Sequence, residues 1–73
     1  MNWMGCELVE RVPGKVSGQP VVVGTRVMPD AIVADYADGS PMEEIQENYP
    51  ALTIETIRGL LAFAEEQRQT PSA

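Results

Sequence analysis

With 73 residues the chain has room for one domain, of a size that depends on disulfides, metals or association with other chains for stability. The single cysteine, Cys6, excludes an internal disulfide, and without histidine the chain cannot supply four zinc ligands. No histidine is present to activate the Cys6 thiol either. We therefore expect no metal, no cofactor and no catalysis. The longest apolar run is too short for a membrane span, so we expect a cytoplasmic protein. Because the domain is small, we expect it to form a homodimer, a higher homo-oligomer or a complex with a partner, and not to bind a small molecule. The net charge of −6 favours a basic protein as that partner.

The N-terminal third predicts a short β arm over about residues 6–27. Residues 6–12 are rich in β-branched side chains in partial alternation, which is typical of a strand. Pro13 and Gly14 predict a turn, and residues 21–23 predict a second short strand. We expect a tail over residues 1–5, a single domain over residues 6–69 and a second tail over residues 70–73.

A tight turn is predicted where Gly24, Thr25 and Arg26 follow the second strand. Gly24 allows a backbone angle that other residues resist, so Gly24 and Thr25 are interpreted as structural turn residues. Two roles stay open for Arg26, which can contact a phosphate or a partner carboxylate, or can pair with a carboxylate of its own chain.

The rest of the chain predicts three helices, over about residues 29–37, 41–48 and 54–67. Pro29 suits the first helical position, and Gly39 suits a left-handed C-terminal cap. Ser40 and Glu43 predict a capping box for the second helix. Thr53 is the predicted N-cap of the third helix.

Two short helices joined by a tight turn and preceded by a third form a helix-turn-helix arrangement, so the predicted fold class is mainly α with an N-terminal β hairpin or arm. In this arrangement the third helix takes the recognition position. Thr53, Thr56 and Arg58 lie at its start, where DNA-binding proteins of this fold read bases. The alternatives are that Thr53 only caps the helix and that Arg58 is a solvated charge.

The excess negative charge lies entirely in the helical half. Residues 31–73 contain Arg58 and Arg68 against eight carboxylates, Asp35, Asp38, Glu43, Glu44, Glu47, Glu55, Glu65 and Glu66. Such a surface repels phosphates and favours a basic protein partner, although a run like Glu43, Glu44 and Glu47 is also typical of a solvated helix face. The cations expected to contact DNA are therefore mainly on the arm, at Arg11, Lys15 and Arg26.

Gly59 lies inside the third predicted helix, where glycine costs roughly 1 kcal/mol relative to alanine. Close approach of another helix or chain would offset this cost, and a tolerated exposed glycine is the alternative. The third helix has apolar residues on more than one face, which a small domain cannot bury alone. We therefore predict a partner or oligomer interface at Gly59, Ala62, Phe63, Glu65 and Glu66.

The segment over residues 18–27, Gly-Gln-Pro-Val-Val-Val-Gly-Thr-Arg-Val, resembles the G-x-P-V-x-x-G-T-R-hydrophobic signature of a bacterial and archaeal family known as domain of unknown function 433. Residues 36–40, 43–45, 49–53 and 57–64 also resemble it, in order and at matching spacing. The likeness covers roughly residues 6–66. Two positions depart from it. Many members have proline directly after the residue that follows the arginine, whereas here Met28 lies between that residue and Pro29. In the third helix, Gly59 stands where many members have alanine.

This resemblance implies a homeodomain-like helical domain with an N-terminal β arm. Several members are described as antitoxins of type II toxin–antitoxin pairs, which dimerise, bind operator DNA and mask a PIN-like ribonuclease toxin. Together with the charge asymmetry, it predicts an antitoxin-like module that binds a basic toxin, with DNA binding as a second role. The alternatives are an autonomous DNA-binding regulator and a homo-oligomeric adaptor with neither partner.

Overall fold

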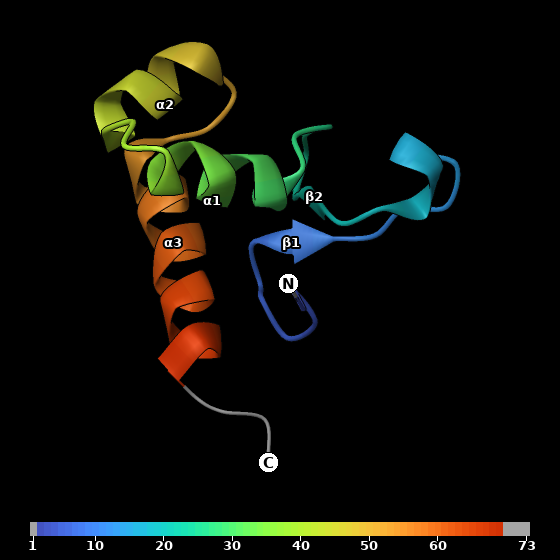
Figure 1. Ribbon diagram of the computed structural model, residues 1–73. Helices are drawn as coiled ribbons and strands as arrows, with labels where there is room; N and C mark the ends of the chain where they lie inside the picture. Colours follow the sequence, from blue (N-terminus) through green and yellow to red (C-terminus); the bar gives the residue numbers. More distant parts are fainter. Residues whose placement is uncertain (1, 70–73) are drawn as a thin grey trace.

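The computed structural model describes residues 2–69 of the chain. The elements in chain order are β1 (Val9–Glu10), a 3-10 turn (Val16–Gly18), β2 (Val21–Val22), α1 (Pro29–Ala37), α2 (Met42–Asn48) and α3 (Ile54–Gln69). The three helices pack together, and the β arm extends to one side of them (Figure 1). The fold is therefore mainly helical with a short two-stranded hairpin, while the tail predicted over residues 70–73 lies outside the described residues.

The hairpin is shorter than the sequence predicts. β1 and β2 run antiparallel, with Val9 opposite Val22 and Glu10 opposite Val21. The predicted strand over residues 6–12 is wrong at its start, because the backbone before β1 bonds to itself. The Cys6 N–H donates to the Trp3 carbonyl at 3.1 Å, and the Val9 N–H donates to the Cys6 carbonyl at 3.2 Å. These local turns use groups that a longer strand would offer to its neighbour.

Within the tail predicted over residues 1–5, Trp3 packs against the helices, while Asn2, Met4 and Gly5 are exposed. Trp3 is only 3% exposed, and its ring stacks on Phe63 of α3 with centroids 5.5 Å apart. Its indole N–H donates to the Asp30 carboxylate of α1 at 2.9 Å. An aromatic side chain buries a large apolar area, so this one residue ties the start of the chain to two helices.

The ends of α1 follow the residue types that mark them. Pro29 is the first residue of the helix, as predicted. At the other end Gly39 has a φ of 103°, its N–H donates to the Tyr36 carbonyl, and the Ser40 N–H donates to the Asp35 carbonyl. This pair of bonds is the Schellman arrangement, which the glycine permits because it has no Cβ.

The predicted capping box at the start of α2 is wrong. Pro41, in an extended conformation, takes the N-cap position, and no side chain caps the helix. The backbone N–H of Ser40, which Glu43 would accept in a capping box, already donates to the Asp35 carbonyl at the end of α1, and α2 begins at Met42. The cap predicted for α3 is confirmed, because the Thr56 N–H donates to the Thr53 hydroxyl at 3.1 Å.

The core lies between the three helices and the start of the chain. Its buried members are Trp3, Cys6, Val22, Ile32, Ile45, Leu52, Ile57, Leu60 and Ala64. Val21 and Val22 are both buried although successive strand residues point to opposite faces, so β2 is covered on both sides. Among the described helices, none is long and apolar enough to cross a bilayer.

Candidate protein-binding surfaces

Hydrogen bonds within the chain hold the turn after β2. The Thr25 hydroxyl donates to the Val22 carbonyl at 2.8 Å and accepts the Val27 N–H at 3.0 Å. Gly24 has a φ of 78°, and its N–H donates to the Glu10 carboxylate at 3.0 Å. Gly24 and Thr25 therefore shape the arm through contacts inside the chain.

Two cations of the arm, Arg11 and Arg26, have no acidic partner in the part of the chain that the structure describes. Lys15 lies 3.8 Å from the Glu10 carboxylate, which offsets its charge. Arg11 and Arg26 are exposed and make no ion pair within residues 2–68. Of the two roles open for Arg26, the internal ion pair is therefore not formed in the described part of the chain.

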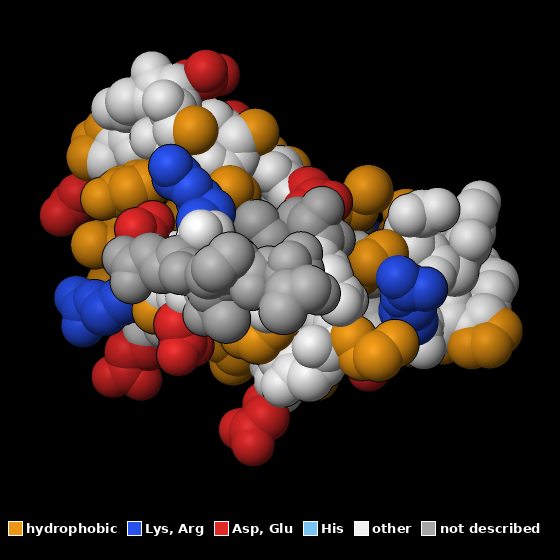
Figure 2. Space-filling model, turned by 60° about the horizontal axis from the view of Figure 1, so that its bottom comes forward, with side chains coloured by type: hydrophobic (Ala, Val, Ile, Leu, Met, Phe, Trp, Pro, Cys, Tyr) orange, Lys and Arg blue, Asp and Glu red, His pale blue; other side chains and the backbone are white. Residues whose placement is uncertain are grey.

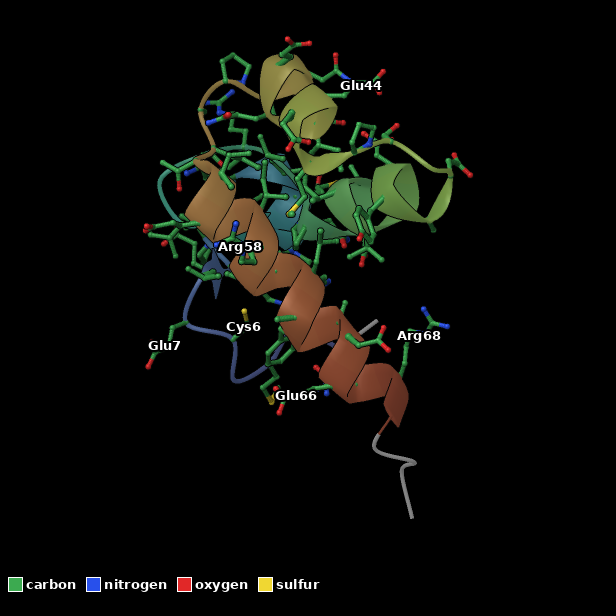
Figure 3. All side chains as sticks on the ribbon, turned by 90° about the vertical axis from the view of Figure 1, so that its left-hand side faces the viewer. Cys6, Glu7, Glu44, Arg58, Glu66 and Arg68 are labelled. Atoms are coloured by element: carbon green, nitrogen blue, oxygen red, sulfur yellow. The ribbon has the colours of Figure 1, made fainter. Side chains whose placement is uncertain are left out.

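The start of α3 brings Thr53 and Thr56 together. The Thr53 hydroxyl accepts the Thr56 N–H and donates to the Thr56 hydroxyl at 3.0 Å. Both hydroxyls thus have partners at the helix end. Arg58, two residues beyond Thr56, is exposed and projects from α3 (Figure 3).

Two of the predicted interface residues are occupied by the chain's own N-terminal segment. A Cβ added at Gly59 would lie 2.6 Å from Cδ1 of Leu8, so the glycine allows a close approach by that leucine. Phe63 is covered by the Trp3 ring. The close approach inferred from Gly59 is therefore explained within one chain. Of the remaining predicted positions, Ala62 and Glu66 are exposed, and Glu65 pairs with Arg68 at 3.8 Å.

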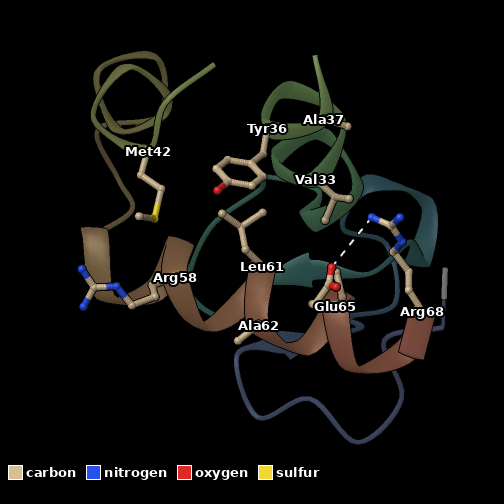
Figure 4. A pocket seen from close by; sticks show the side chains of 10 residues that line it. Val33, Tyr36, Ala37, Met42, Arg58, Leu61, Ala62, Glu65 and Arg68 are labelled. Atoms are coloured by element: carbon tan, nitrogen blue, oxygen red, sulfur yellow. Dashed lines mark ion pairs between the residues drawn. The ribbon is translucent and has the colours of Figure 1, made fainter. Parts of the chain in front are cut away.

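A groove between α1 and α3 was not predicted. Its volume is about 440 Å³, and its lining residues are Val33, Tyr36, Ala37, Met42, Arg58, Leu61, Ala62, Ala64, Glu65 and Arg68. Figure 4 shows Tyr36, Met42 and Leu61 turned toward this space, with Arg58 toward one end of α3 and the Glu65–Arg68 pair toward the other. Tyr36 is 50% exposed, which is unusual for a residue on an apolar stripe. We call this surface the helix groove.

The sequence carries one signal for the helix groove, which is the surplus of apolar residues on the third helix. By helical spacing Tyr36 continues an apolar stripe with Ile32 and Val33, and Met42 begins one with Ile45 and Tyr49. A residue on such a stripe is normally expected to face the core. Only the packing shows that the stripes of α1 and α2 leave these side chains partly in solvent beside Leu61.

A second surface is formed by α2 alone. Glu43, Glu44 and Glu47 are exposed and make no ion pair within the described residues. Figure 3 shows Glu44 pointing away from the rest of the molecule. In the view of Figure 2, acidic side chains project from the edges of the helical part, and apolar side chains are exposed between them. We call the three glutamates the acidic face; their mutual repulsion is relieved only by solvent ions or by a cationic partner.

Within residues 2–69 no group of three acidic, cysteine or histidine side chains is placed to hold a metal ion. The Cys6 thiol is buried in the same core cluster as Trp3 and Val22. A buried thiol behaves as a small apolar side chain, so Cys6 contributes to packing.

Comparison with known proteins identifies the family. The sequence model described as "Protein of unknown function (DUF433)" matches residues 9–64. The crystal structure of a DUF433 member from Anabaena variabilis ATCC 29413 superposes with a TM-score of 0.68 at 29% sequence identity, covering 85% of this chain and 61% of that one. This chain thus spans less than two thirds of that relative's length. A search of curated proteins found no match to this chain. The match over most of the sequence, with the shared fold, places this chain in the DUF433 family.

Proposed function

We propose that this protein is a non-catalytic binding module of the antitoxin type, which binds a basic protein such as a PIN-like ribonuclease toxin in the cytoplasm. The observation that carries the proposal is the acidic face, where three glutamates on one short helix have no cationic partner within the described residues. A complementary basic surface would remove their repulsion and speed the encounter.

We also propose that the fold is a homeodomain-like helix-turn-helix domain. α2 and α3 are joined by a short turn over residues 49–53, and α1 packs on both, which is the element order of a homeodomain-like helix-turn-helix domain.

The exposed Arg11 and Arg26 favour a second candidate function, an autonomous DNA-binding regulator whose arm contacts phosphates. Lys15 contributes less to either role because Glu10 offsets its charge.

The experiment that tests the antitoxin role is affinity capture of the tagged protein from its native host, with nuclease treatment. A variant carrying E43Q, E44Q and E47Q removes the acidic face. The matched control carries E7Q, D38N and E55Q, which removes equal charge from exposed positions outside α2 and outside the predicted interface. We expect the wild type and the control to recover a small basic protein in near-equal amount, and the acidic-face variant to lose it.

Three results would contradict the antitoxin role. One is recovery of the protein alone, which leaves the homo-oligomeric adaptor. Another is recovery of DNA that disappears on nuclease treatment, which leaves the regulator. The third is equal retention of a partner by both variants, because then the acidic face does not bind it.

A further inference from the structure

We propose that the helix groove is the contact between two copies of this chain, in which α3 packs antiparallel against α3 of the second copy. The proposal does not depend on the antitoxin role, because it uses a different surface from the acidic face. It identifies what covers the exposed Tyr36 and the half-buried Met42 and Leu61. A domain of 73 residues with one cysteine gains stability most readily from such an association.

The charges around the helix groove indicate the kind of partner. Residues 31–73 contain only two cations, Arg58 and Arg68, and both line this groove. A basic protein therefore fits this surface poorly, although it fits the acidic face. Along α3 the groove presents Arg58, then Glu65, then Arg68, so its charges alternate in sign. A partner with the same alternation running in the opposite direction would match it.

A second copy supplies that alternation. Let two α3 helices lie antiparallel, with the two-fold axis midway between Leu61 and Ala62. Arg58 and Glu65 then lie at equal heights on either side of the axis, each about 5 Å from it at a rise of ~1.5 Å per residue. Arg58 of each copy consequently faces Glu65 of the other, and the pairing occurs twice, as an isologous contact requires.

The centre of this arrangement suits close helix packing. Leu61 is half-buried and Ala62 is exposed and small, so the centre combines an apolar contact with little steric bulk. Helices approach to roughly 8–10 Å when small side chains lie at the contact. Tyr36 and Val33 of α1 flank Leu61 on the other side of the groove and add apolar area (Figure 4).

The existing pair between Glu65 and Arg68 does not oppose this contact. Both side chains are largely exposed, at 56% and 76% respectively, and their atoms are 3.8 Å apart. Such surface pairs contribute little to stability, so the loss of the pair with Arg68 would cost the second arrangement little. Partial burial between two helices strengthens the attraction between Arg58 and Glu65, and it also removes water from both charges, so the contact serves mainly to fix the register of the two helices.

A charge exchange at two exposed positions tests the proposal by sedimentation equilibrium. The wild type is expected to sediment at twice the 8.0 kDa of one chain. R58E and E65R each place like charges opposite each other, so each is expected to raise the dimer Kd about tenfold or more. The double variant R58E/E65R restores both pairs in reversed order and is expected to return the Kd to within about threefold of the wild type.

Two controls separate this contact from general electrostatics and from misfolding. R11E and E44R alter exposed charges on other elements and are expected to leave the Kd unchanged. Helical circular dichroism establishes that each variant is folded. A wild type that is monomeric at all concentrations would overturn the proposal. Single variants without effect, or a double variant as weak as the singles, would also overturn it. Loss of toxin capture with intact dimers would bear only on the proposed function.

Discussion

Because Leu8 lies close to α3, the effect on stability of replacing Gly59 by alanine is expected to depend on whether the Leu8 side chain is present. Alanine normally stabilises a helix interior by roughly 1 kcal/mol relative to glycine. In G59A, however, the new Cβ would lie 2.6 Å from Cδ1 of Leu8, so the leucine must leave its position. Overpacking of this kind costs about 1–3 kcal/mol. We therefore expect G59A to leave stability unchanged or to lower it by up to about 2 kcal/mol.

Removing the leucine side chain should reveal the helix preference. Among the described residues, no side chain other than that of Leu8 lies within 4 Å of the added Cβ, so in an L8A background G59A is expected to stabilise by about 1 kcal/mol. The double-mutant cycle thus predicts a coupling of roughly 1–3 kcal/mol between the two positions. Urea denaturation at one protein concentration measures it, with the fluorescence of Trp3, the sole tryptophan, as the signal.

One result would refute the reasoning. If G59A stabilises the wild type and the L8A variant equally, Leu8 does not occupy the space above Gly59. The N-terminal segment would then not lie against α3 in solution. The stacking of Trp3 on Phe63 would be in question too, because it belongs to the same contact.

Two further predictions concern single hydroxyl groups and use the same denaturation measurement. T53A removes the acceptor of the Thr56 N–H and should destabilise by about 1 kcal/mol, whereas T53S keeps the hydroxyl and should cost less. T25V keeps the side-chain shape but leaves the Val27 N–H and the Val22 carbonyl without the hydroxyl, for an expected loss of about 1–3 kcal/mol. A T53S loss as large as that of T53A, or an unchanged stability of T25V, would contradict these assignments.

The helical part of the fold could be predicted because its boundaries are set by neighbouring residues. Pro29, Gly39 and Thr53 each act on backbone groups within a few positions, so their types indicate where helices begin and end. The error at Ser40 has the same origin. Two helices separated by a short connection compete for one residue, and residue type alone does not decide which helix uses it.

The N-terminal segment and the helix groove could not be predicted in the same way. Trp3 meets Asp30 and Phe63, which are distant in sequence, and nothing in their spacing indicates the contact. Gly59 did signal a close approach, but the sequence could not tell a second chain from Leu8 of the same one. The groove depends on how α1 sits on α3, which follows from tertiary packing and not from either helix's own pattern.

The central claim is that the helix groove pairs two copies of this chain while the acidic face binds a basic protein. Native mass spectrometry of the complex purified from the original host tests this claim most directly. The account predicts an assembly that contains two copies of this chain and a basic polypeptide. It also predicts that R58E separates the copies without releasing the polypeptide. A mass of one 8.0 kDa chain alone would contradict the account, as would an assembly that R58E leaves intact.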